Sequence, residues 1–207
     1  MRAAAALITA AAVAVLAATP AQAATVTLTS GHVDVLDVDY NAGALVLTVN
    51  DDVAERDPAD VVLQVPAAAK VAVPSGSGWS FLGAPGATAW VLPQSSTAGL
   101  LWAGWNTTEI PSGVLQGNSV TFRLNSVTGP GNVSVYTVSA GTPTRLYDSS
   151  DGLPDTRTVA RNVHAHANWG FTAAGTYTVT FEVTGKLAST GATVTSGAKA
   201  FTFDVLP

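Results

Sequence analysis

Hydrophobic and polar residues alternate along most of the chain, a pattern typical of β-strands with one buried face. The alternating segments are rich in threonine, valine, tyrosine and phenylalanine, which pack well on a pleated surface. No segment has the periodicity of a helix of ordinary length, and residues 52–60 leave room for one short helical turn. The strands are predicted at residues 25–29, 32–35, 44–49, 61–65, 119–124, 132–138, 176–183 and 198–205.

Turns rich in glycine, proline and asparagine separate these segments. They lie at residues 41–43, 74–78, 129–131, 150–152 and 189–191. Short strands between such turns are typical of a sandwich or a barrel. We therefore predict an all-β fold, an antiparallel β-sandwich of the immunoglobulin-like kind, formed as a single domain by residues 24–207. The long Trp- and Gly-rich stretch 75–118 is predicted to be an insertion in that sandwich.

The first 23 residues differ from the rest of the chain. The positive Met1-Arg2 precedes the uncharged run Ala3–Ala18, and Ala21-Gln22-Ala23 has the small-x-small pattern of a cleavage site. This arrangement predicts a secretory signal peptide over residues 1–23. The apolar run is shorter than the ~20 residues that span a bilayer. We expect a secreted, extracellular or cell-surface protein without a transmembrane segment in the mature chain.

Charge and composition exclude several classes of protein. The chain has 9 basic and 14 acidic residues, a net charge of −5, whereas a nucleic-acid partner calls for a basic face. A hydrophobic fraction of 47% with 11% charged residues disfavours intrinsic disorder. The absence of cysteine excludes a disulfide scaffold, a thiolate metal site and a cysteine nucleophile. A transition-metal site would therefore use imidazole and carboxylate ligands.

The three histidines lie in two short motifs, Gly-His-Val-Asp and His-Ala-His-Ala-Asn-Trp. Residues two apart in a strand face the same side, so His164 and His166 project together, as do His32 and Asp34. Three imidazoles with a carboxylate or a water form a ligand set that zinc favours, and the Asp34 oxygen also admits manganese. The alternative from the sequence alone is a cross-strand polar pair of histidines without a metal.

Other acidic residues lie close to the first motif in the sequence. Asp37 and Asp39 follow Asp34, and they are candidates for carboxylates that hydrogen-bond to the metal ligands. Asp51 and Asp52 follow the next predicted strand without matching a calcium-binding loop. The alternative interpretation of all five, Asp34, Asp37, Asp39, Asp51 and Asp52, is that they are mostly solvated carboxylates of strands and turns.

The segment His164-Ala-His-Ala-Asn-Trp-Gly-Phe-Thr-Ala-Ala-Gly-Thr-Tyr177 resembles the hallmark of a known family, the actinobacterial surface-anchored repeat or choice-of-anchor M domain. The segments at residues 31–34, 90–94, 100–105 and 129–131 also fit this family. The resemblance implies a surface protein that works beside the substrate-binding protein of a metal-type ABC transporter. Members are anchored by a sortase signal or a transmembrane tail, and the sequence shows neither, so we expect a released form.

Four further residues are candidates for a functional surface. Asn168 and Trp169 follow the histidine motif directly, and we expect them to orient or cover the metal. Trp102 and Trp105 offer a second hypothesis, in which they stack on sugar rings in a glycan- or wall-binding adhesive module without a metal. The alternative for these two indoles is a place in the core.

A three-histidine zinc with an open position could activate water, with Asp34 as its base, but Asp34 could equally be a ligand. Other sequence signals disfavour catalysis. The sequence has no Gly-x-Ser-x-Gly nucleophile elbow, and none of its glutamates adjoins a histidine motif. We therefore predict a binding protein and not an enzyme. Its predicted role is to capture zinc or manganese through His32, His164, His166 and Asp34 for an associated ABC importer.

Overall fold

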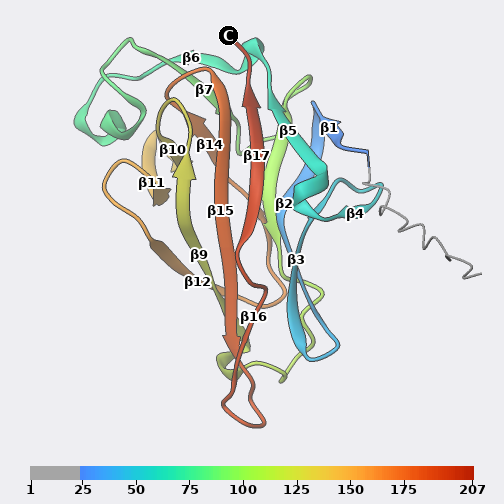
Figure 1. Cartoon of the computed structure of the whole chain (residues 1–207). Helices are drawn as coiled ribbons and strands as arrows, with labels where there is room; N and C mark the ends of the chain where they lie inside the picture. Colours follow the sequence, from blue (N-terminus) through green and yellow to red (C-terminus); the bar gives the residue numbers. More distant parts are fainter. Residues whose placement is uncertain (1–23) are drawn as a thin grey trace, which may run out of the picture.

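The computed structural model describes residues 24–207, and the predicted signal peptide, residues 1–23, lies outside the described residues. Over the described range the chain forms seventeen strands and four short 3-10 helices. The strands assemble into three sheets (Figure 1), which confirms the predicted all-β class. Within residues 24–207, no helix has the length and apolar character needed to cross a membrane.

The largest sheet has seven strands and lies at the front of Figure 1. Buried and more exposed positions alternate along β15 and β17, as expected where one face meets the core. In hydrogen-bonded order the strands are β1 (Val26–Leu28), β5 (Val61–Val65), β17 (Lys199–Val205), β15 (Gly175–Lys186), β9 (Ser119–Thr128) and β12 (Asp155–Ala160), with β16 (Thr193–Thr195) paired to β15.

Two five-stranded sheets complete the fold. The second sheet has the order β11 (Thr142–Asp148), β10 (Val133–Ser139), β14 (Asn168–Phe171), β7 (Thr88–Leu92) and β6 (Lys70–Ala72). The third has the order β13 (His164–His166), β8 (Leu101–Asn106), β2 (Gly31–Asn41), β3 (Ala44–Asn50) and β4 (Glu55–Arg56). The 3-10 helices are η1 (Pro58–Asp60), η2 (Ala67–Ala69), η3 (Ser77–Leu82) and η4 (Gln116–Asn118).

All three sheets contribute to one hydrophobic core. Phe181 and Phe203 of the large sheet, Trp169 of the second sheet and Trp105 of the third belong to the same cluster of buried side chains. Trp169 stacks on Phe203 with ring centroids 5.5 Å apart, which joins two of the sheets directly. This shared core fixes the position of the third sheet, which carries the histidines.

The pairing of strands departs from the predicted antiparallel arrangement. The pairs β1·β5, β5·β17 and β2·β8 are parallel, so two of the three sheets are mixed. Parallel neighbours require a long crossover between the paired strands. Here the chain leaves one sheet, adds strands to another and then returns, a route that the alternation within single segments does not reveal.

Residues 75–118 do not form a separate insertion. They supply β7 to the second sheet and β8 to the middle of the third. Both strands are buried along nearly their whole length, so they lack the alternation by which the other strands were predicted. The Trp- and Gly-rich stretch is therefore part of the framework of the fold.

Candidate metal centre

The three histidines and Asp34 meet on one face of the third sheet, across the strand β8. Strand β2 supplies His32 and Asp34, the edge strand β13 supplies His164 and His166, and β8 runs between them. Asp34 and His166 both pair in register with Gly104 of β8. The fold thus brings together two motifs that the sequence separates by 132 positions, counted from His32 to His164.

Gly104 makes this convergence possible because it adds no side chain between the two motifs. A Cβ atom at this position would lie 2.5 Å from Nδ1 of His166 and 2.5 Å from the backbone oxygen of Ala165. Both distances are far below van der Waals contact, and one of them is to backbone. The imidazole of His166 therefore lies over β8 only because residue 104 is glycine.

The donor atoms of the four side chains lie close enough to share one ion. Nε2 of His164 is 3.0 Å from Nε2 of His32 and 3.1 Å from Oδ1 of Asp34, and the last two atoms are 3.8 Å apart. With His166 included, one donor atom from each residue lies within 4.8 Å of all the others. Tetrahedral zinc at bond lengths of ~2.1 Å holds its donors about 3.4 Å apart. The group can therefore hold a metal ion.

Asp34 is a buried carboxylate whose negative charge a bound cation would stabilise. Its side chain is 4% exposed, and burial is the main cause that raises its pKa, opposed by its attraction to His164 and His32. A carboxylate removed from water is costly unless a positive charge or hydrogen bonds replace the lost hydration. A metal ion held between Asp34 and the histidines would provide that charge.

His166 presents an uncharged imidazole to the same point. Both of its ring nitrogens are buried and have no hydrogen-bond partner among residues 24–207. Burial, followed by the charges of His32 and His164, lowers the pKa of His166 from 6.5 to about 4. The ring is therefore neutral at physiological pH, the form in which histidine binds metals.

Asp52 holds His32 in the orientation of a metal ligand. Nδ1 of His32 lies 2.8 Å from Oδ1 of Asp52, a carboxylate oxygen that accepts its hydrogen, and Nε2 faces His164 at 3.0 Å. Asp52 adopts a left-handed backbone conformation, φ 63°, and its N–H donates to Oδ1 of Asn50 at 3.0 Å. Asp52 is an exposed turn carboxylate, as expected, and it also contacts His32 because the turn after β3 folds back towards β2.

Trp102 supports His166 from the side. The two rings stack with centroids 3.7 Å apart and planes inclined by 16°, and the same indole meets the edge of His32 at 5.5 Å. Nε1 of Trp102 donates to the backbone oxygen of Gln94 at 2.8 Å. Trp102 is therefore a wall of the site, held in place from outside it.

Asn168 does not contact the ligands directly but supports the residues that hold them. Its Oδ1 accepts from the backbone N–H of Gln94 at 3.0 Å, and its Nδ2 donates to Oε1 of Gln94 at 2.9 Å and to the backbone oxygen of Tyr136 at 3.1 Å. Since Gln94 in turn anchors Trp102, this buried amide orients the site through two intermediate residues.

Trp169 and Trp105 lie in the core and not at the site. Trp169 is fully buried against Phe203 and Phe181, so it does not cover the metal ligands as expected. Trp105 is 6% exposed and has the guanidinium of Arg157 over its ring at 5.4 Å. Trp102 and Trp105 point to opposite sides of β8, so they do not form the common stacking platform suggested for sugars.

The other carboxylates near the first motif form a separate group. A bulge in β2 between Asp34 and Leu36 brings Asp37 into register with Asn106. Asp37 is buried and accepts hydrogen bonds from Nδ2 of Asn106 at 2.9 Å and Nδ2 of Asn50 at 3.2 Å. Its carboxylate lies close to those of Glu55 and Glu109. Asp37 thus adds negative charge beside the centre without hydrogen-bonding to the histidines.

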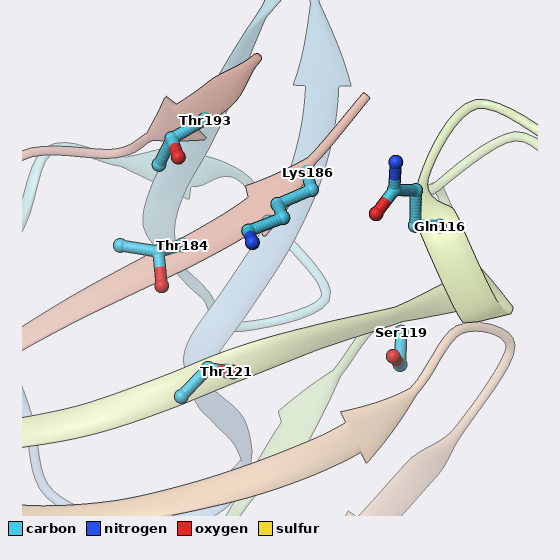
Figure 2. A pocket seen from close by; sticks show the side chains of 7 residues that line it. Gln116, Ser119, Thr121, Thr184, Lys186 and Thr193 are labelled. Carbon is cyan, nitrogen blue, oxygen red and sulfur yellow. The ribbon is translucent and has the colours of Figure 1, made fainter. Parts of the chain in front are cut away.

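A polar groove of about 390 Å³ lies elsewhere, over β9, β15 and β16 (Figure 2). Hydroxyl groups of Thr121, Thr184 and Thr193, with the ammonium group of Lys186, line much of it. None of the four candidate ligands borders this groove. It therefore adds nothing to the chemistry of the metal centre.

Comparisons of the chain with family models, with curated proteins and with solved structures find no match. The arrangement of the residues therefore carries the functional argument.

Proposed function

We propose that the protein binds one transition-metal ion, zinc or manganese, through His32, His164, His166 and Asp34. The observation that carries this proposal is the convergence of four donor atoms, from two distant segments, within 4.8 Å of one another. A chance pair of histidines on one strand would not bring a buried carboxylate and a third imidazole to the same point. The support from Asp52 and Trp102 points the same way, since metal ligands are commonly held by hydrogen bonds to their other ring nitrogen.

The donor set favours zinc over manganese and binding over catalysis. Three imidazole nitrogens and one carboxylate oxygen suit zinc, whereas manganese is better served by sites richer in oxygen. Four protein donors are also the number that fills the coordination of zinc in non-catalytic sites, and catalytic zinc keeps a position open for water. We therefore place the protein among metal-binding proteins, with no enzymatic activity.

We further propose that the protein acts outside the cell, as a member of the surface-anchored repeat family that passes its metal to an ABC importer. The predicted signal peptide supports export. Most of the segments that carry the family resemblance also meet at the centre: residues 31–34 and the first half of the histidine motif provide the ligands, residues 100–105 provide Trp102 and Gly104, and Gln94 anchors Trp102. A shared metal site would explain why these particular segments resemble the family.

Calorimetric titration of the metal-stripped protein with zinc and with manganese tests the metal site. We expect one zinc ion per chain, weaker binding of manganese, and loss of zinc binding in His166→Ala. Asp151→Asn, which removes an exposed carboxylate that is not one of the candidate ligands, should bind zinc like the wild type. Wild-type protein that is folded by circular dichroism and binds neither metal would refute the proposal.

A further inference from the structure

Building on the proposed metal site, we infer that His164 is the exchangeable ligand, and that the protein hands its metal to an acceptor by direct ligand exchange at this residue. The acceptor that fits is a protein offering neutral imidazole donors from a basic surface. Three features of His164 support this inference: its exposure, its lack of outside support and its place on an edge strand.

Exposure differs sharply among the four ligands. The side chain of His164 is 45% exposed, that of His32 is 17% exposed and that of Asp34 only 4%. Both ring nitrogens of His166 are buried. An incoming donor can therefore reach the metal from the side of His164, while the other three ligands form the floor of the site.

Outside support is also unequal. Asp52 holds His32, Trp102 holds His166, and Asp34 is fixed within the central strand β2. The polar contacts of the His164 ring, within the part of the chain that the structure describes, are with Nε2 of His32 and Oδ1 of Asp34. These partners are metal ligands themselves. Among residues 24–207, no polar contact outside the ligand set restrains the His164 ring from turning away.

The backbone of His164 is also accessible, because it lies on an edge strand. Strand β13 has three residues and lies at the end of its sheet, where β8 is its one neighbour among the strands of residues 24–207. An edge strand leaves one side of its backbone without a partner strand. An acceptor can approach along this side without opening the core.

The exchange is a substitution at the metal without electron transfer. A donor atom of the acceptor bonds to the metal as the bond between the metal and Nε2 of His164 breaks. His164 leaves as neutral imidazole, and any proton carried by the acceptor donor passes to water. The three remaining ligands keep the ion bound until further acceptor donors replace them.

The charge around His164 limits the kind of acceptor. The side chain of Asp52 is 68% exposed beside His32, and two further exposed carboxylates, Glu55 in β4 and Glu109 in the turn after β8, lie close to the buried Asp37. A carboxylate-rich acceptor would be repelled by this surface, whereas imidazole donors with basic neighbours would be attracted. An acceptor with neutral donors therefore fits this acidic surface.

Stopped-flow transfer of zinc from the loaded protein to terpyridine, a neutral nitrogen chelator, tests the inference. We expect the rate to rise in proportion to the chelator concentration, since the chelator enters before His164 has left. At a given chelator concentration we expect His164→Ala to transfer zinc faster than the matched variant His32→Ala, because His164→Ala opens the position of the exchanging ligand to the chelator. If His164→Ala does not fold, His164→Asn replaces it in the same comparison.

Two results would overturn the inference while leaving the metal site in place. One is a transfer rate that does not depend on chelator concentration, which would mean that zinc dissociates first. The other is equal acceleration in His164→Ala and His32→Ala. By contrast, failure of the wild-type protein to load zinc at all would overturn the proposed function itself, so the two outcomes are distinct. A polycarboxylate chelator at equal concentration should extract zinc more slowly than terpyridine, and faster extraction would contradict the imidazole-type acceptor.

Discussion

The indole of Trp102 lies flat against the imidazole of His166, with ring centroids 3.7 Å apart and planes inclined by 16°. A hydrogen bond from Nε1 to the backbone oxygen of Gln94 prevents the indole from turning. Stacked aromatic pairs contribute about 0.5–1.5 kcal/mol beyond the area they bury. The stack therefore fixes the orientation of His166 before a metal arrives, which reduces the conformational entropy lost on binding.

Substitutions of Trp102 test the contribution of the Trp102–His166 stack to zinc binding without changing a ligand. Trp102→Ala should weaken zinc binding by about tenfold, because His166 loses the surface that orients it. Trp102→Phe keeps a flat ring in place and should bind zinc nearly as well as the wild type. Calorimetric titration of both variants checks this prediction, which fails if the two variants bind zinc with the same affinity.

Asp52 offers a test of the hydrogen bond to His32. Asp52→Asn removes the negative charge that accepts from Nδ1 of His32 and should lower zinc affinity about 10–100-fold. Because the Asp52 side chain is 68% exposed, the melting temperature without metal should hardly change. Asp151→Asn, an exposed carboxylate outside the site, is the matched control and should leave zinc affinity unchanged. Equal affinities for the two variants would show that Asp52 does not support His32.

Gly104→Ala tests whether β8 must lack a side chain under His166. The new Cβ would lie 2.5 Å from both Nδ1 of His166 and the backbone oxygen of Ala165, so β13 must move. We expect a loss of about 1–3 kcal/mol in the free energy of unfolding, together with loss of zinc binding. Urea denaturation and calorimetry measure the two effects.

Gly78→Ala is the control for this substitution. A Cβ at position 78 would meet the ring of Pro143 at 3.7 Å, an ordinary contact distance. This variant should keep both its stability and its zinc affinity. Zinc binding by Gly104→Ala at the wild-type affinity would mean that β13 yields without disturbing the ligands.

The pairing of ligands within each motif could be predicted from the sequence, whereas the meeting of the motifs could not. Alternation along a strand places His164 beside His166 and His32 beside Asp34, and the structure keeps both pairs. The link between them is β8, whose burial pattern hides its strand character, so the role of Gly104 has no local signal. The contact of Asp52 with His32 likewise depends on the path of a turn.

Asp37 was expected to hydrogen-bond to the metal ligands and Trp169 to cover them, and tertiary packing gives both residues other partners. The bulge between Asp34 and Leu36 brings Asp37 into register with Asn106, so its carboxylate accepts from Asn106 and Asn50 and not from a histidine. Trp169 adjoins the histidine motif in sequence, yet the chain passes from the third sheet to the second at Ala167, and the indole enters the core. Bulges and crossings between sheets arise from tertiary packing, which short-range patterns do not encode.

The second half of the histidine motif serves the fold and not the metal. The ring of Tyr177 occupies the space where a Cβ at Gly129 would lie, and its hydroxyl donates to the backbone oxygen of Ala173 at 2.8 Å. Gly131 leaves room for Thr172 and for the hydroxyl of Tyr177 in the same way. The motif therefore combines two ligands with the tyrosine-and-glycine contact that anchors the start of β15.

The low pKa of His166 predicts how the stability of the metal-free protein depends on pH. The folded protein lowers this pKa from 6.5 to about 4, so folding favours the neutral ring. Well above pH 6.5 the His166 ring is neutral in both the folded and the unfolded protein. Its titration then takes nothing from the free energy of unfolding. Between pH 6.5 and about 4 the unfolded chain binds a proton that the folded chain does not, so the free energy of unfolding should fall as the pH falls.

Urea denaturation in the presence of a chelator, at several pH values from 8 to 4, measures this effect. His166→Gln removes the titrating group, and its free energy of unfolding should fall less steeply over the same range than that of the wild type. The stabilisation gained from added zinc should shrink over this range, because the imidazole ligands must be neutral to bind the metal. Parallel pH profiles for the wild type and His166→Gln would show that His166 is not held neutral by the fold, and would remove one support for its role as a ligand.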